Sequence, residues 1–172
     1  MDWWRDIYAA LKKADVKQIV YVPDAGHASL IEACIEDNEI NTVPLTTEEE
    51  GVALLAGAWL GGRRGALLMQ SSGVGNTVNA LSLPAACRMP FFTIVTMRGE
   101  WGEGNPWQLP MGQGAPGVLK AMGVTLYRVE QAQDVTDTVN AAAAQAFNNQ
   151  CSCLLYTSDA ADERSSVDLG GR

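Results

Sequence analysis

Short, continuously apolar segments alternate with helical segments along most of this 172-residue chain. Apolar runs typical of buried strands occupy residues 18–23, 41–45, 65–70, 90–97 and 124–129. Helical patterns occupy residues 3–11, 29–37, 48–60, 77–88, 116–123 and 132–147, and a long loop is expected over residues 98–114. Strands that are apolar on both faces and joined by helices indicate a parallel sheet covered on both sides. We therefore predict an α/β domain of three layers (α/β/α) around a parallel sheet of about six strands.

The last twenty residues, CLLYTSDAADERSSVDLGGR, differ in character from the rest of the chain. Back-translated, CLLYTS resembles a transposon end used in sequencing libraries, and DAADE and VDLGGR resemble the adapter that follows it. We interpret residues 1–152 as the domain and residues 153–172 as adapter read-through, with the last native strand lost by truncation. The tail should then make few contacts, except that CLLYT is drawn into a vacant edge-strand position. The alternative is an ordinary polar C-terminal tail.

Charge and cysteine content exclude several classes of protein. The formal net charge is −8 and the basic residues are scattered, so we expect no nucleic-acid partner. No apolar run reaches the length of a membrane span, and the first residues predict an amphipathic helix rather than a signal peptide. The cysteines (Cys34, Cys87, Cys151 and Cys153) lack metal-ligand spacing. We therefore expect no metal site within this chain, and a reducing, cytoplasmic setting.

Polar or glycine-rich segments follow the first four predicted strands. They are PDAGH, TTEEE, SSGVGN and RGEWGEGNPWQ, in that order. In parallel α/β sheets, ligands bind beyond the carboxyl ends of the strands. The four segments should therefore meet at one edge of the sheet and form a ligand site there.

Three consecutive glutamates open the predicted helix of residues 48–60, in which residues 53–58 are mostly small. One interpretation is helix capping, since Thr47 and Glu50 have the spacing of a capping box and acidic residues suit the positive end of a helix. The other is chemical, because a carboxylate beside a small-residue surface is poorly solvated and typical of a functional site. Capping accounts for Glu48 and Glu50 but leaves the small-residue surface unexplained.

The loop SSGVGN does not match a nucleotide-binding pattern. A dinucleotide fingerprint needs a third glycine where Val78 stands, and a phosphate loop needs a Gly-Lys-Ser/Thr sequence that does not follow. The simplest interpretation is a glycine turn that enters a helix capped by Asn76.

Two basic side chains stand at this edge with more than one possible role. His27 is the only histidine, and it is either a structural hydrogen-bonding group or a catalyst near Asp24. Arg98 follows a strand beside the long loop. It either pairs with Glu100 or Glu103, or it clamps an anionic substrate, for which a guanidinium is well suited.

Taken together, the motifs resemble the pyrimidine-binding domain of thiamine-diphosphate enzymes. The segments YVPDAGHASLI, TTEEEGVALLAGAWLGG, LLMQSSGVGNTVNALSL, TMRGEW and PMGQGAPGVLKAMGV occur in that family's order and spacing, from the first helix to about Phe147. The chain is most similar to the alpha subunit of sulfopyruvate decarboxylase and to phosphonopyruvate decarboxylase. The resemblance implies the thiamine-diphosphate-binding fold and a 2-oxo acid decarboxylase with an anionic substrate.

The resemblance also assigns site residues. In this family, one glutamate binds N1′ of the cofactor's pyrimidine and lies nine residues before the small residue of an Ala-x-Gly-Tyr turn. Ala58 takes the small residue's place here, so Glu49 is the catalytic candidate. Further candidates for the cofactor are Ser72, Gly73, Val74, Gly75 and Asn76, and those for the substrate are Asp24, His27, Arg98 and Gln108. Gly57 and Trp59 depart from the family's turn, which affects packing more than chemistry.

The family's Gly-Asp-Gly signature, which binds diphosphate and Mg²⁺, is absent from this sequence. The resemblance therefore implies a beta subunit that carries it, in a hetero-oligomer of at least two alpha and two beta chains. Two alternatives remain open: the front part of a one-chain carboligase of the acetolactate synthase type, and a non-catalytic flavodoxin-like binding module. The residues do not distinguish a sulfonate from a phosphonate substrate, nor decarboxylation from carboligation.

Overall fold

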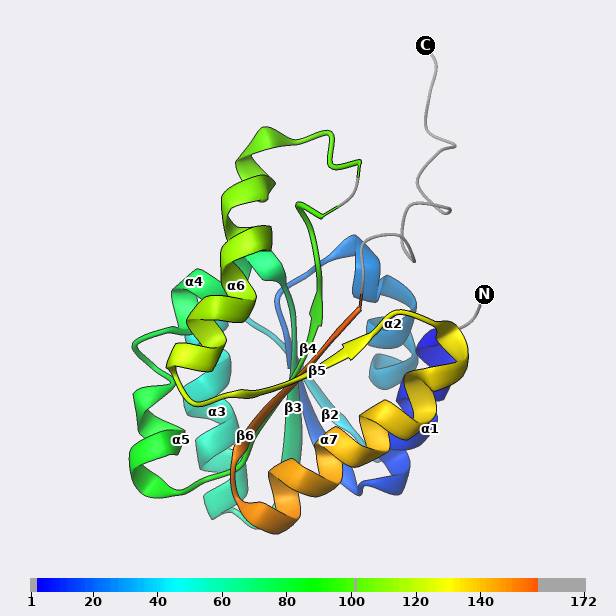
Figure 1. The fold of residues 1–172 in the computed structure, drawn as a ribbon. Helices are drawn as coiled ribbons and strands as arrows, with labels where there is room; N and C mark the ends of the chain where they lie inside the picture. Colours follow the sequence, from blue (N-terminus) through cyan, green and yellow to red (C-terminus); the bar gives the residue numbers. More distant parts are fainter. Residues whose placement is uncertain (1–2, 101, 158–172) are drawn as a thin grey trace.

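The predicted apolar runs form the strands of one parallel sheet (Figure 1). The computed structural model describes residues 3–100 and 102–157. Within them the sheet has six strands in the order β2-β1-β3-β4-β6-β5. The strands are β1 (Val16–Tyr21), β2 (Asn41–Pro44), β3 (Arg64–Gln70), β4 (Phe91–Thr96), β5 (Thr125–Val129) and β6 (Ser152–Thr157). The predicted fold class is confirmed.

Helices cover both faces of the sheet. They are α1 (Trp3–Lys13), α2 (Ala28–Glu36), α3 (Glu48–Leu60), α4 (Val74–Thr77), α5 (Ser82–Cys87), α6 (Leu109–Ala121) and α7 (Val135–Asn149). Single 3₁₀ turns precede four of them: η1 (Ala25–His27), η2 (Ser71–Gly73), η3 (Pro106–Gln108) and η4 (Ala132–Asp134). In Figure 1, α1, α2 and α7 lie on one side of the sheet, and α3 to α6 lie on the other.

Alternate strand residues feed two separate hydrophobic cores. Leu68 and Phe92 point to the core shared with α1, α2 and α7, which also holds Ile7. Leu67 and Phe91 point to the opposite core, beneath α3, α4 and α6. Because most of the strands contribute to both cores, their sequences are largely apolar, which was the pattern that predicted a covered parallel sheet.

The sixth strand corrects our expectation for the tail. Ser152–Thr157 forms β6, which pairs with β4 on one side and with β5 on the other, so it is not an edge strand. Cys153, Leu154 and Leu155 are buried. Apolar burial and two backbone ladders give this segment many contacts, and it crosses the expected domain boundary at residue 152. Residues 158–172 lie outside the described residues, and the origin of the tail stays a prediction.

Two helices differ from their predicted limits. Helix α6 begins at Leu109 and contains Pro116, so the loop that we extended to residue 114 is shorter. We had placed Pro110 in the loop and begun the helix at Pro116, although Pro110 in the first turn of a helix loses no hydrogen bond. The helix predicted over residues 77–88 is also divided, because α4 ends at Thr77 and α5 begins at Ser82.

In the part of the chain that the structure describes, every helix is too short or too polar to cross a lipid bilayer.

Candidate active site

The four polar segments meet at the carboxyl edge of the sheet, where the order of the strands reverses. Strands β2 and β3 lie on opposite sides of β1, so the order in which the chain adds strands reverses there. Ligands of open α/β sheets bind beyond the carboxyl ends of the strands at such a reversal. Hydrogen bonds join the turn after β1 to the ends of β3 and β4, and the start of α3 to α4. The predicted meeting of these segments is confirmed.

The three glutamates at the start of α3 have different environments. Glu48 is buried, with 7% of its surface exposed, whereas Glu49 and Glu50 are exposed. Our expectation that Glu49 is the poorly solvated carboxylate is therefore wrong for this chain by itself. The first turn of α3 directs Glu48, not Glu49, toward α4.

Glu48 is held by the turn that follows β3. Its Oε2 accepts a hydrogen bond from Asn76 Nδ2 at 2.7 Å. A Cβ atom on Gly73 would lie 2.1 Å from Glu48 Oε1, so only glycine leaves room for this carboxylate. Asn76 therefore ties α4 to α3, and the predicted role of its side chain as a helix cap is wrong because α4 has no side-chain cap.

The predicted capping box of α3 forms only in part. Thr47 is the N-cap residue but its side chain makes no capping hydrogen bond. Glu50 Oε2 accepts a hydrogen bond from the backbone N–H of Thr46 at 2.8 Å. The Glu50 side chain thus reaches back over the start of the helix, as in a capping box. It binds Thr46, one residue before the N-cap residue that the box uses.

The candidate cofactor residues alternate between exposed and buried positions. Ser72, Gly75 and Asn76 are exposed, whereas Gly73 and Val74 are buried. The Val74 side chain belongs to the core beneath α3 and α6. Only the backbone of Val74 can therefore face a ligand without a change in the core.

Asp24 forms a buried polar junction between strand ends. Its Oδ1 accepts a hydrogen bond from Gln70 Nε2 at 2.8 Å, and its Oδ2 accepts one from Thr96 Oγ1 at 2.6 Å. Gln70 Oε1 in turn accepts a hydrogen bond from Ser72 Oγ at 2.7 Å. The Asp24 side chain is 9% exposed, so it faces its protein partners rather than the crevice. Sequence reasoning missed Gln70 and Thr96, although both stand at the carboxyl ends of their strands.

His27 lies behind this junction. It is fully buried, and neither ring nitrogen has a hydrogen-bond partner among the described residues. Its Nδ1 lies 3.8 Å from Asp24 Oδ2. Burial lowers the pKa of His27 to about 4, against an opposing effect of the nearby Asp24 carboxylate. The imidazole is therefore neutral at neutral pH, and its burial separates it from a substrate in the crevice.

The salt-bridge alternative for Arg98 forms with Glu103. Arg98 Nε and Nη2 donate to the two carboxylate oxygens at 2.8 and 2.9 Å. Hydrogen bonds from this guanidinium and from backbone N–H groups lower the pKa of Glu103 to about 2, although partial burial opposes the shift. The Glu103 side chain is 1% exposed while that of Arg98 is 39% exposed, so the arginine side chain keeps part of its surface in solvent. Gln108 Oε1 is buried without a hydrogen-bond partner among the described residues.

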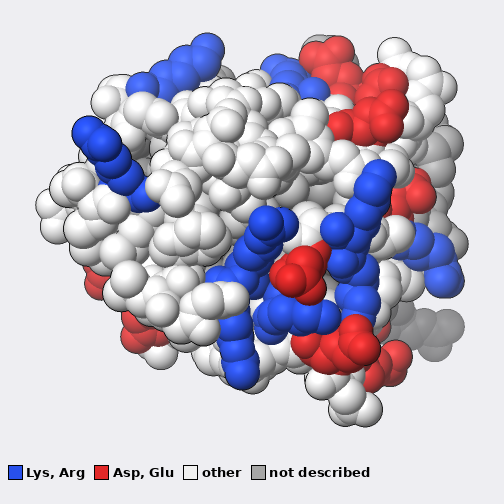
Figure 2. Space-filling model, turned by 90° about the horizontal axis from the view of Figure 1, so that it is seen from below, with Lys and Arg blue, Asp and Glu red and all other residues white. Residues whose placement is uncertain are grey.

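The amino edge of the sheet is built from ion pairs. Figure 2 shows this face, where lysine and arginine side chains gather around carboxylates. Lys12 Nζ lies 2.6 Å from Asp37 Oδ2 and 2.7 Å from Glu39 Oε2. Lys17 Nζ lies within 3.6 Å of both Asp15 and Glu39. Lys12 and Lys17 are therefore paired with carboxylates within the chain.

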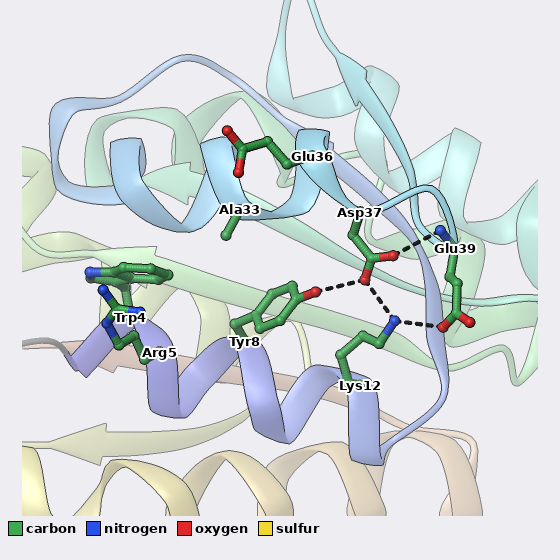
Figure 3. A pocket seen from close by; sticks show the side chains of 8 residues that line it. All are labelled: Trp4, Arg5, Tyr8, Lys12, Ala33, Glu36, Asp37 and Glu39. Carbon is green, nitrogen blue, oxygen red and sulfur yellow. Dashed lines mark hydrogen bonds and ion pairs between the residues drawn. The ribbon is translucent and has the colours of Figure 1, made fainter.

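A groove of 640 Å³ lies between α1 and α2, away from the carboxyl edge (Figure 3). Tyr8 and Lys12 point across it from α1 and both donate to Asp37 Oδ2. These hydrogen bonds lower the pKa of Asp37, with the Lys12 ammonium as the largest cause. The Tyr8, Lys12, Asp37 and Glu39 side chains are thus satisfied by one another.

No group of three or more His, Cys, Asp or Glu side chains within residues 3–100 and 102–157 could hold a metal ion.

Comparisons with known proteins agree with the geometry. Residues 1–125 match the family described as thiamine pyrophosphate enzyme, N-terminal TPP binding domain. The chain is 34% identical over 142 residues to the sulfopyruvate decarboxylase subunit alpha of Methanocaldococcus jannaschii, covering 82% of this chain and 84% of the relative. It is 39% identical over 119 residues to the subunit alpha of Methanothermobacter thermautotrophicus, covering 69% of this chain and 72% of the relative.

A longer relative and a solved structure extend this comparison. The chain is 39% identical over 99 residues to the phosphonopyruvate decarboxylase of Streptomyces viridochromogenes, covering 57% of this chain but 25% of the relative. The fold is similar to a 2-oxoglutarate:ferredoxin oxidoreductase from Magnetococcus marinus, with a TM-score of 0.78 and 13% identity. That match covers 94% of this chain and 29% of the oxidoreductase chain, and at this identity it supports the fold alone.

Proposed function

Because the chain belongs to the thiamine pyrophosphate enzymes, through their N-terminal TPP-binding domain, we propose that it is the pyrimidine-binding alpha subunit of a thiamine-diphosphate-dependent 2-oxo acid decarboxylase. The names of its relatives support a substrate with an acidic tail, such as sulfopyruvate or phosphonopyruvate. The subunit names also support a heteromer in which a second chain completes the site.

The position of Glu49 is the observation that carries this proposal. Glu49 is exposed in the first turn of α3, at the carboxyl edge, and its carboxylate makes no hydrogen bond or ion pair among the described residues. Its neighbour Glu48 is fixed by Asn76 and Gly73, so the backbone that carries Glu49 is also fixed. A free carboxylate on a rigid support fits a cofactor ring that must be bound from this side.

The cofactor would supply an electron sink for the loss of carbon dioxide. Glu49 would bind N1′ of the pyrimidine and exchange a proton with that nitrogen. The partner subunit would cover the Glu49 carboxylate and exclude water, which favours the protonated form that can share its proton. Exposed Ser72, Gly75 and Asn76 would line the same ring, and exposed Gly75 presents no side chain to block it.

The substrate's acidic tail would bind near Arg98. Arg98 follows the carboxyl end of β4, and 39% of its side-chain surface is exposed. Glu103 holds it in place through two hydrogen bonds. Gln108, which brings a buried oxygen without a partner, remains a second candidate. Burial of Asp24 and His27 makes direct contact with the substrate unfavourable for these two residues.

Mg²⁺ and the diphosphate would bind to a beta subunit that carries a Gly-Asp-Gly signature, since this sequence lacks one. We propose a complex of at least two alpha and two beta chains, in a reducing cytoplasmic setting. The free cysteines support that setting, and burial raises the pKa of Cys34 to about 12, which makes its thiol inert.

The proposal is tested by reconstitution with the subunit encoded by the neighbouring reading frame. Carbon dioxide should be released from sulfopyruvate or phosphonopyruvate when thiamine diphosphate and Mg²⁺ are present. Condensation of two 2-oxo acids would favour the carboligase alternative, and no cofactor-dependent activity with the partner would favour the binding module. The chain alone should bind thiamine diphosphate weakly, and tight Mg²⁺-dependent binding in calorimetry would contradict the two-subunit arrangement.

A further inference from the structure

A small cavity lies at the amino edge of the sheet, between the C-terminal end of α1 and helix α7. Its volume is 290 Å³, and its walls come from the end of α1, from the first residue of β3 and from α7. Lys13 and Arg64 line it, and the described residues around it include no carboxylate. The whole chain has a net charge of −8, so a cavity with two cations and no acid stands apart from the rest of the molecule.

Arg64 is held in one orientation but keeps most of its donors. Its Nη1 donates to the backbone oxygen of Ala14 at 3.0 Å, and its guanidinium carbon lies 5.2 Å from the centre of the Phe147 ring. The bond to Ala14 caps the C-terminal end of α1, which is a structural role. That bond uses one N–H group, whereas a guanidinium has five. Among the described residues no other acceptor binds Arg64, so its remaining donors are available to a ligand.

Lys13 brings a second positive charge to the same cavity. It is exposed in the last turn of α1, and it makes no hydrogen bond or ion pair with any residue that the structure describes. Its neighbour Lys12 is paired with Asp37 and Glu39. A lysine in this turn suits the negative end of the helix dipole, and Lys12 already meets that need. The Lys13 ammonium can therefore turn toward an anion in the cavity.

The wall on α7 is polar at its ends and apolar between them. Asn140 and Asn148 supply side-chain amides, whereas Ala143, Ala144 and Phe147 supply apolar surface. Residues 140, 144 and 148 are spaced by four, so they share one face of the helix. A mostly apolar wall with a few convergent polar groups is typical of a small-molecule pocket.

We propose that this cavity binds a small organic carboxylate, whose charged group contacts Arg64 and Lys13 and whose apolar body lies on Ala143 and Ala144. The planar guanidinium matches the two oxygens of a carboxylate. A volume of 290 Å³ is small for a ligand pocket, so the body should be no larger than a single aromatic ring. The cavity lies at the opposite edge of the sheet from the candidate active site, and the inference does not depend on the proposed function.

The binding test uses NMR of the full chain, with benzoate as the probe. Benzoate should shift the side-chain amide signals of Asn140 and Asn148, with a dissociation constant in the millimolar range. Acetate lacks the apolar body and should bind several-fold more weakly, and benzyl alcohol lacks the charge and should cause no shift. The ionic strength is held constant, so that screening of surface charge does not contribute. Equal binding of acetate and benzoate, or no shift of either asparagine, would overturn the proposal.

Two adjacent arginines separate a specific site from general surface charge. Arg64→Gln should weaken benzoate binding about ten-fold, because a charge-assisted contact is lost. Arg63→Gln is the matched control, since Arg63 is exposed and is not among the described residues that line the cavity. It removes the same charge and should keep the affinity. Equal losses in the two variants would mean that benzoate is attracted by surface charge alone, which would contradict the proposal.

Ala144→Leu tests the cavity without removing a charge or a hydrogen bond. Ala144 is exposed on α7, and leucine forms helices almost as well as alanine, so the variant should fold. Its larger side chain should fill the cavity and abolish benzoate binding, and this result holds even where Arg64→Gln disturbs the end of α1. Ala141→Leu is the control, because Ala141 is exposed on the same helix but is not among the described lining residues. Benzoate binding that persists in Ala144→Leu, or that is lost equally in Ala141→Leu, would overturn the proposal.

Discussion

The two edges of the sheet hold their carboxylates in different ways. At the amino edge, Asp37 and Glu39 share the Lys12 ammonium, and Glu39 also pairs with Lys17. At the carboxyl edge, Asp24 and Glu48 are held by hydroxyl and amide donors, which satisfy their oxygens without cancelling their charge. The two carboxylates at the amino edge are therefore ion-paired, whereas Asp24 and Glu48 at the carboxyl edge accept hydrogen bonds and have no ion pair with lysine or arginine among the described residues. Carboxylates that are held by neutral donors are typical of a binding site, whereas ion-paired carboxylates near the surface are typical of a structural site.

The largest effect is expected at Glu49. Glu49→Gln keeps the shape of the side chain but loses the shared proton, so cofactor activation in the reconstituted complex should slow about 10²- to 10⁴-fold. Exchange of the C2 proton of the bound cofactor measures this step. The urea midpoint should not change, because the carboxylate makes no hydrogen bond or ion pair among the described residues. Equal exchange rates in the unaltered complex and in Glu49→Gln would remove Glu49 from the mechanism.

Glu50→Gln is the matched control for that experiment. Glu50 is also exposed, but its oxygen accepts the backbone N–H of Thr46. In Glu50→Gln, exchange of the C2 proton of the bound cofactor should stay near the normal rate. The free energy of unfolding should fall by about 0.5–2 kcal/mol at most, from a weaker helix start.

The next effect is on stability, at Gly73. Gly73→Ala would place a methyl group against the Glu48 carboxylate and displace it from Asn76. We expect a loss of about 1–3 kcal/mol in the free energy of unfolding, from overpacking and a lost buried hydrogen bond. Gly57→Ala is the control, because its Cβ would meet nothing within 4 Å and alanine favours a helix. If the two variants have equal urea midpoints, Glu48 is not held as described.

A smaller effect concerns pH and Glu103. Its pKa is about 2 in the folded chain against an ordinary value of 4.5, so its ion pair stabilises the fold fully above about pH 4.5. That stabilisation is lost as the pH falls toward 2. Glu103→Gln should therefore be less stable than the unaltered chain at neutral pH, and the difference should shrink in acid. Urea midpoints across this range test the sign, and a difference that grows in acid would contradict it.

The smallest effect is expected at the amino edge. Lys12→Met removes the ammonium that holds the pKa of Asp37 below its usual range. The Lys12 and Asp37 side chains are 29% and 12% exposed, and ion pairs near the surface contribute little, so the urea midpoint at neutral pH should fall only slightly, and the loss should vanish in acid. The cofactor-dependent rate of the complex should not change. A clear loss of rate would mean that the two edges are coupled, which would break the comparison between them.

The sequence predicted the sheet well because most of its strands are apolar on both faces. It could not show which of three consecutive glutamates is buried. Helix α3 reads EEEGVALLAGAWL and has no polar face after its first turn, so the pattern does not reveal which side packs against the sheet. Glu48 is directed inward by the close approach of Gly73, which depends on a turn far away in the sequence.

The junction at Asp24 was also beyond the sequence. Its partners, Gln70 and Thr96, stand 46 and 72 residues away and meet Asp24 only because β1, β3 and β4 are neighbours in the sheet. His27 and Asp24 were predicted at the correct edge, but burial could not be foreseen from a polar loop. CLLYT, a short apolar run after a helix, was expected to join the sheet as a strand, but its place between β4 and β5 could not be read from that run.

The place of β6 governs the order in which the chain can fold. Strand β5 precedes β6 in sequence, yet the only strand that β5 pairs with in the described sheet is β6. During synthesis, β5 therefore has no neighbour to join until the final strand emerges and inserts beside β4. The half of the sheet from β1 to β4 can assemble early, while β5 must wait for a contact that comes late. A ribosome-bound chain that stops before β6 should expose two unpaired strand edges, which are sites for aggregation or for chaperone binding.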